Sequence, residues 1–207
     1  METDCRLYLV TPPTLPPDFP TLLAAALDAG DVAAVRLDLP GSEADTLRQA
    51  AEALRPIVQS RGVAFILADN AKLAAATACD GVHLAQSETP PDQARRLIGD
   101  LQLGVFCAAS RDLAMEAGDA GADYISFGPF LTGAENGPDP ELINWWSELM
   151  ELPVVAEGAI TPENCAQLVQ AGADFLAVGD AVWNNADGPA AAVRALIEAI
   201  EAAVQGD

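Results

Sequence analysis

Basic side chains are scarce in this chain. Its 207 residues include 10 lysine and arginine residues against 31 aspartate and glutamate residues, with one histidine and a formal net charge of -21. A field of this sign repels nucleic acid and anionic membrane surfaces, so we exclude both as partners. It also disfavours anionic substrates unless metal ions or a local group of positive side chains compensates.

Long hydrophobic runs and paired cysteines are missing too. Proline, aspartate or glycine interrupts each apolar run before membrane-spanning length, and residues 1–4 carry no basic signal-peptide region. The four cysteines are scattered without a C-x-x-C pair, which indicates neither a zinc site nor a disulfide framework. We therefore expect a cytoplasmic, soluble protein with reduced thiols, and residues 1–207 as one domain.

The stretch from residue 152 to residue 180 gives the structural unit. An unbroken apolar run at 152–156 is typical of a strand covered on both faces of a parallel sheet. Thr161 and Pro162 suit the start of a helix over 161–171, and Gly172 suits its left-handed end. A second strand at 175–178 ends at Gly179. The unit is a strand, a helix and a strand with a glycine turn after each strand, where barrel enzymes often bind phosphate.

The rest of the chain repeats this unit. The patterns predict strands at residues 7–10, 32–37, 63–68, 81–84, 101–107, 124–127, 152–156 and 175–178. They predict helices at residues 21–29, 43–60, 72–78, 91–98, 111–120, 141–150, 161–171 and 189–204. Eight alternations favour an α/β fold, a closed single-domain (β/α)8 TIM barrel, with an open doubly wound sheet as the alternative. The connector Gly-Ala-Asp, used before Tyr124 and again before Phe175, strengthens the barrel interpretation.

Several blocks together resemble a known family. They are Leu7-Tyr8-Leu9-Val10-Thr11, the strand that holds Arg36, Phe65-Ile66-Leu67-Ala68-Asp69, Gly81-Val82-His83-Leu84-Ala85-Gln86, Gly121-Ala122-Asp123-Tyr124 with Phe127-Gly128-Pro129, and Glu157-Gly158-Ala159-Ile160. In this order they look like the thiamine-phosphate synthase superfamily, which includes the thiazole tautomerases. The resemblance implies a barrel that joins a hydroxymethylpyrimidine diphosphate to a thiazole phosphate, releasing pyrophosphate with Mg²⁺.

Carried over by position, the resemblance implies a set of site residues. The expected substrate or phosphate contacts are Arg36, Lys72, His83, Gly128, Gly158, Ala159, Val178 and Gly179. Asp69 and Glu88 follow neighbouring strands and would hold the magnesium ion, since carboxylate oxygens suit a hard cation. The sequence assigns no catalytic residue. Two solvated loop acids in an acidic protein remain the alternative for the metal pair.

The departures from the family pattern concern charge. Asp38 stands where the family usually has a lysine, and Glu157 and Asp180 flank the turns that would hold a phosphate. Phe106 replaces a small hydroxyl residue, and the loop at 131–137 lacks the family's lysine. Each acid near a phosphate opposes binding by about as much as one helix N-terminus contributes. We therefore expect weak or absent synthase activity.

Three functional hypotheses follow. The first is a magnesium-dependent thiamine-phosphate synthase. The second is a descendant without turnover that binds a small molecule, such as a thiamine precursor or a related neutral or cationic heterocycle, or that acts through a partner. The third is a metal-dependent barrel enzyme of other specificity that uses Asp69 and Glu88. A homo-oligomer is compatible with all three.

Overall fold

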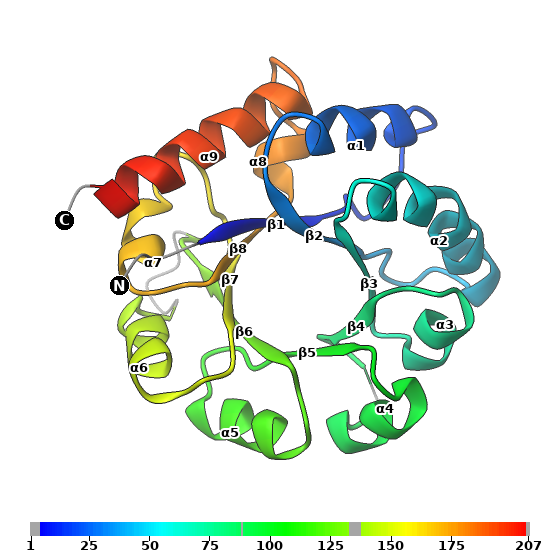
Figure 1. Ribbon diagram of the computed structural model, residues 1–207, viewed down its shortest axis with the longest axis horizontal. Helices are drawn as coiled ribbons and strands as arrows, with labels where there is room; N and C mark the ends of the chain where they lie inside the picture. Colours follow the sequence, from blue (N-terminus) through cyan, green and yellow to red (C-terminus); the bar gives the residue numbers. More distant parts are fainter. Residues whose placement is uncertain (1–4, 88, 133–137, 206–207) are drawn as a thin grey trace.

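Eight parallel strands close into a barrel. The computed structural model describes residues 5–87, 89–132 and 138–205. The strand order is β1-β2-β3-β4-β5-β6-β7-β8, and β1 closes onto β8 through pairs such as Leu7 with Leu176 and Leu9 with Val178. Figure 1 looks along the barrel, with the strands as an inner ring and the helices around it. The predicted closed barrel is confirmed, and the open sheet is excluded.

The elements lie close to the predicted ranges. The strands are β1 (Arg6–Val10), β2 (Val32–Leu37), β3 (Ala64–Ala68), β4 (Gly81–Leu84), β5 (Gln102–Phe106), β6 (Tyr124–Phe130), β7 (Val154–Gly158) and β8 (Phe175–Val178). The helices are α1 (Phe19–Leu27), α2 (Ala44–Gln59), α3 (Ala71–Ala76), α4 (Pro91–Ile98), α5 (Arg111–Asp119), α6 (Glu141–Leu149), α7 (Ala166–Gln170), α8 (Asp180–Trp183) and α9 (Pro189–Gln205). No helix in these described ranges is long and apolar enough to cross a membrane.

Alternate strand residues build two separate cores. Outward side chains such as Leu9, Phe65 and Leu176 pack against the helices in one large cluster. Inward side chains form a second cluster inside the barrel, made of Tyr8, Ala34, Ile66, Tyr124, Val155 and Ala177. Because both strand faces are buried, the strands read as continuous apolar runs rather than as alternating ones. The polar exceptions, including Arg36 and His83, point into the barrel beside the second cluster.

Aspartates at the helix-to-strand connectors tie neighbouring strands together. The Asp123 carboxylate accepts a hydrogen bond from the Leu103 backbone N–H at 2.8 Å, and Asp174 accepts one from Val154 at 2.8 Å. Asp80, in the looser third copy of the connector, accepts from Phe65 at 2.7 Å. In each case the aspartate just before an even-numbered strand binds a backbone N–H near the start of the preceding strand. The repeated connector is therefore one structural device, which satisfies a backbone donor at the base of the barrel.

Three local predictions were wrong. The predicted helix over 161–171 is regular only from Ala166, and a turn over residues 162–165 precedes it, in which the Asn164 side chain accepts from the Thr161 N–H at 2.7 Å. β6 extends to Phe130, since Phe130 pairs with Gly158 across a register shift. The short helix α8 directly after β8 was not predicted as a helix.

Gly104 makes room for a tyrosine inside the barrel. A Cβ atom at Gly104 would lie 2.1 Å from Cζ of the buried Tyr124 ring. We predict that Gly104→Ala lowers the free energy of unfolding by about 1–3 kcal/mol, because the buried ring must move away from the methyl group and strain the hydrogen bonds of its hydroxyl to Tyr8 and His83.

The matched control is Gly118→Ala in α5, where the added methyl group would lie 3.2 Å from Leu152 Cδ1. Alanine is favoured over glycine inside a helix by up to about 1 kcal/mol, so this variant should be neutral or more stable. Urea denaturation of the two variants measures the difference. Equal stability of the two variants would contradict this account of Gly104.

Candidate active site at the barrel mouth

A cluster of polar side chains fills the carboxyl-terminal half of the barrel interior, below the open end that we call the barrel mouth. Arg36 comes from β2, His83 from β4, Ser126 from β6 and Glu157 from β7. These positions face inward because they alternate with side chains packed against the helices. Arg36 is 5% exposed and His83 and Ser126 are fully buried, so water screens their charges poorly.

Arg36 and Glu157 form a two-pronged ion pair across the barrel. Arg36 Nη1 donates to Glu157 Oε1 at 2.9 Å, and Nη2 donates to Oε2 at 2.8 Å. Burial would raise the pKa of Glu157, but Arg36 and His83 outweigh it and hold this pKa well below its usual range. Burial likewise opposes the charged form of Arg36, and Glu157 nevertheless raises the Arg36 pKa. Both groups are therefore ionised at neutral pH and bound to each other.

The third nitrogen of the Arg36 guanidinium group, Nε, makes no normal hydrogen bond with the described residues. This atom is buried. Asp38 Oδ2 lies 3.5 Å from it, which is too far for a normal hydrogen bond. Burial raises the pKa of Asp38, although Arg36 opposes the shift.

His83 links Glu157 to a pair of tyrosines. Its Nε2 atom lies 3.2 Å from Glu157 Oε1 and 3.4 Å from Ser126 Oγ, and its Nδ1 atom lies 3.2 Å from the Tyr124 hydroxyl. Tyr124 and Tyr8 share a hydrogen bond of 3.0 Å. Burial, with Arg36 adding to it, lowers the pKa of His83, so the imidazole is neutral at pH 7. Burial raises the pKa of Tyr8 to about 12.

The predicted metal ligands are only partly described. Asp69 Oδ1 accepts from the backbone N–H groups of Ala85 at 2.7 Å and Gln86 at 2.9 Å, and Asp69 itself has a positive φ of 56°. Glu88 lies outside the described residues. Within residues 5–87, 89–132 and 138–205, no group of three or more His, Cys, Asp and Glu side chains could hold a metal ion. The magnesium site therefore stays a prediction.

The glycine-rich turns lie together at the mouth. Gly128 precedes a cis proline, and a Cβ atom there would lie 2.4 Å from the Glu157 carbonyl oxygen. A Cβ atom at Gly158, which has φ 152°, would lie 2.0 Å from the Phe130 carbonyl oxygen. The Ala159 N–H donates a hydrogen bond to the Phe130 carbonyl oxygen at 3.0 Å. The backbone of β6 and β7 is thus tightly packed against itself here.

The other predicted phosphate contacts, Gly179, Val178 and Lys72, differ in their position and exposure. Gly179 forms the N-cap of α8, and the exposed Asp180 occupies the first turn of this helix. The side chain of Val178 is buried in the outer core, so only its backbone can face the mouth. Lys72 is exposed on α3. The structure therefore brings Arg36 and His83 together against Glu157, while Lys72 is exposed near the start of α3.

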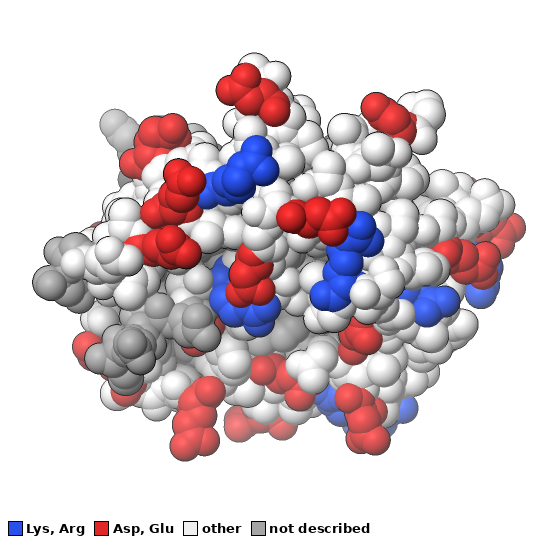
Figure 2. Space-filling model, turned by 45° about the horizontal axis from the view of Figure 1, so that its top comes forward, with Lys and Arg blue, Asp and Glu red and all other residues white. Residues whose placement is uncertain are grey.

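A cavity of about 300 Å³ lies beside this cluster, at the ends of β2, β3 and β4. Its lining includes two acids, Asp38 and Asp69, and each raises the cost of placing an anion there. Figure 2 shows acidic side chains outnumbering basic ones on the face it displays. Asp38 and Asp69 thus give this side of the mouth the negative character that the composition gives the whole chain.

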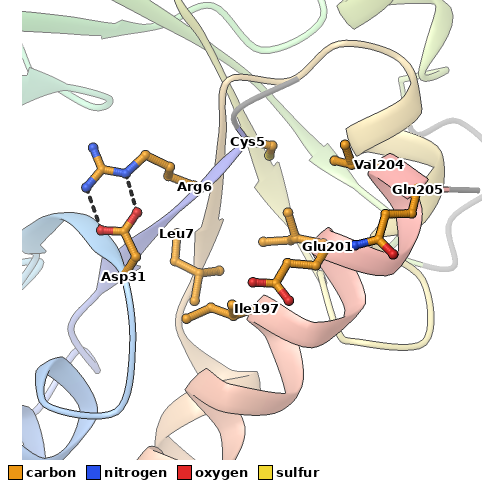
Figure 3. A pocket seen from close by; sticks show the side chains of 9 residues that line it. Cys5, Arg6, Leu7, Asp31, Ile197, Glu201, Val204 and Gln205 are labelled. Atoms are coloured by element: carbon orange, nitrogen blue, oxygen red, sulfur yellow. Dashed lines mark hydrogen bonds and ion pairs between the residues drawn. The ribbon is translucent and has the colours of Figure 1, made fainter. Parts of the chain in front are cut away.

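A different cavity, of about 230 Å³, lies between the start of β1 and α9. Figure 3 shows Cys5, Ile197 and Glu201 around it, with the Arg6 side chain turned toward Asp31. None of the predicted site residues lines this cavity in the described part of the chain. It lies at the amino-terminal end of β1, away from the barrel mouth.

Comparison with known proteins identifies the family. The family model described as thiamine monophosphate synthase matches residues 7–182. The chain belongs to this family. Thiamine-phosphate synthase of Rhodospirillum centenum is 56% identical over 197 residues, covering 92% of this chain and 95% of the relative. The corresponding protein of Erythrobacter litoralis is 44% identical over 211 residues, with 98% of each chain covered.

A solved structure agrees with the sequence comparison. Thiamine phosphate pyrophosphorylase of Pyrococcus furiosus superposes with a TM-score of 0.86 at 25% identity, covering 98% of both chains. The family resemblance inferred from the sequence blocks is therefore confirmed.

Sequence reasoning missed two features of the site. It treated Glu157 as an acid that repels phosphate and did not pair it with Arg36, 121 positions away. It also assigned no role to Tyr8 and Tyr124. Their alternation with outward residues on β1 and β6 was the available signal, because it places both rings inside a barrel.

The protonation of His83 gives a pH prediction. The folded pKa lies below the ordinary value of 6.5, so the unfolded chain takes up this proton first as the pH falls. The contribution of His83 to stability is therefore complete above about pH 6.5 and decreases below it, at up to about 1.4 kcal/mol per pH unit, until the folded pKa is reached.

His83 is the only histidine, so His83→Gln removes this contribution selectively. We predict that the wild-type protein loses more stability than His83→Gln between about pH 7.5 and about pH 5.5, as measured by urea denaturation. Equal losses in the two proteins would show that the buried imidazole is not neutral.

Proposed function

We propose that this protein is of the thiamine-phosphate synthase type, belongs to thiamine biosynthesis and is located in the cytoplasm. Its condensing activity is weak or absent. The reaction joins a hydroxymethylpyrimidine diphosphate to a thiazole phosphate and releases pyrophosphate. Support for the pathway comes from relatives named thiamine-phosphate synthase that match nearly their whole length. Support for weak turnover comes from one observation, the engagement of Arg36 by Glu157.

A diphosphate needs positive charge that this mouth does not supply. Arg36 is the cation in the described cluster, and Glu157 already neutralises it at 2.8 Å. An additional anion would meet Asp38 and Asp69 as well. At an effective dielectric constant near 20, one like charge at 4 Å costs about 4 kcal/mol, comparable to the gain from one new ion pair. A diphosphate could bind only by displacing Glu157 from Arg36.

Magnesium belongs to the proposal as the ion that would offset part of this repulsion. Asp69 and Glu88 are its proposed ligands, and Asp69 offers the oxygen Oδ2, since Oδ1 already accepts two backbone hydrogen bonds. When bound, the ion would neutralise charge on the leaving pyrophosphate.

Binding without turnover is the second candidate. The cavity that contains Asp38 and Asp69 has room for a single heterocyclic ring, and its acids favour a neutral or cationic molecule over a phosphorylated one. A thiamine precursor without phosphate groups meets both conditions.

A direct assay tests the proposal. We predict little or no magnesium-dependent formation of thiamine phosphate by the purified protein, next to an active synthase as a positive control. Robust formation would refute the weak-activity proposal.

A thermal-shift experiment tests the physical reason. In Glu157→Gln the side chain keeps its size but no longer neutralises Arg36, so pyrophosphate should become the missing counter-ion. We predict that pyrophosphate raises the melting temperature of Glu157→Gln by about 2–4 °C for each kcal/mol of binding. The wild type should not shift.

The charge-matched control is Glu163→Gln, which removes an exposed acid from the turn that follows β7. It should behave like the wild type. Equal shifts in all three proteins would mean that Glu157 does not control access to Arg36.

A further inference from the structure

A cavity of about 270 Å³ opens at the amino-terminal end of the barrel, opposite the mouth. Its wall is mostly apolar and includes Ala34, Ile66, Val155 and Phe175, all from inward positions of the strands. An engineered apolar cavity of about 150 Å³ is large enough to bind benzene. The volume of this cavity therefore suits one substituted aromatic ring.

The rim of this cavity carries charged side chains that are already paired. Arg6 donates to Asp31 at 2.6 and 2.7 Å. Asp123 accepts from Arg95 and from the Leu103 backbone N–H. Neither side chain needs a ligand to balance its charge, so the cavity favours a neutral molecule.

Tyr8 and Tyr124 both line this cavity, and the order of donors through their hydroxyl groups can be worked out. Glu157 is ionised, so the neutral His83 ring places its single proton on Nε2, facing Glu157 Oε1. His83 Nδ1 then accepts from the Tyr124 hydroxyl at 3.2 Å. Because the Tyr124 proton is used there, the Tyr124 oxygen must accept the Tyr8 proton across 3.0 Å.

The donors therefore all point from Tyr8 toward Glu157. The Tyr8 oxygen is the last atom in this series, and it donates without accepting within the series. A hydroxyl oxygen has two lone pairs, so Tyr8 keeps acceptor capacity beside the cavity that it lines. A buried oxygen of this kind is best satisfied by an N–H or O–H donor.

We propose that this cavity is a second ligand site, which binds a neutral single-ring aromatic molecule that donates one hydrogen bond to the Tyr8 oxygen. The ring fills the apolar part of the cavity, and the donor sets its orientation. This site lies at the other end of the barrel from the proposed phosphate contacts. It does not depend on whether the mouth carries out any reaction.

Phenol and toluene are suitable probes, since they have the same number of non-hydrogen atoms and only phenol donates a hydrogen bond. Titrations followed by NMR should give saturable binding of both, with dissociation constants on the order of 1 mM for ligands of this size. Phenol should bind the wild type more tightly than toluene does.

Two variants locate the site. Tyr8→Phe keeps the ring and removes the acceptor, so we predict about 3- to 10-fold weaker phenol binding and unchanged toluene binding. Ala34→Leu fills the cavity from its wall and should abolish binding of both probes. Ala25→Leu adds the same side chain on the exposed face of α1 and should change nothing.

Thermal melts of each variant establish that it is folded. Absence of saturable binding to the wild type would overturn the proposal. Binding that survives Ala34→Leu in folded protein would overturn it as well, because the probes would then occupy another place. Phenol binding that Tyr8→Phe leaves unchanged would refute the role of the Tyr8 oxygen.

Discussion

The ion pair between Arg36 and Glu157 determines the electrostatics of this barrel. A buried guanidinium without a partner would carry a desolvation cost of several kcal/mol, and so would a buried carboxylate. Their two parallel hydrogen bonds offset these costs and fix both side chains across the interior. The position of the single proton on the neutral His83 ring and the order of hydrogen bonds through Tyr124 to Tyr8 both follow from an ionised Glu157. The binding of phosphate at the mouth and the free acceptor capacity of the Tyr8 oxygen beside the opposite cavity thus both depend on this ion pair.

The barrel around this pair is built by a repeated rule. Asp80, Asp123 and Asp174 each lie just before an even-numbered strand and accept a backbone N–H from the strand before it. The amino-terminal end of the barrel is therefore held by local contacts between neighbouring strands. In the carboxyl-terminal half polar side chains meet across the interior while the strands stay paired through their backbones, so substitutions there change the chemistry while the fold persists.

The fold could be predicted because its signals are local. Apolar runs bounded by glycine and proline gave the strands, Ser110 accepts from the Leu113 N–H as a helix cap does, and Gly172 has the expected positive φ of 94°. The start of α7 could not be predicted, because the turn over residues 162–165 has the features of a helix start, with the Thr161 N–H bound by the Asn164 side chain, yet the regular helix begins only at Ala166. Nor could the pairing of Arg36 with Glu157. Spacing along the chain does not tell which side chains meet across a barrel.

A crystal structure determined with magnesium and millimolar pyrophosphate tests the central claim most directly. We predict that Arg36 remains bound to both oxygens of Glu157 and that no pyrophosphate occupies the turns beside Gly158 and Gly179. An Arg36 side chain turned toward a pyrophosphate held on these turns, with Glu157 displaced, would contradict the account.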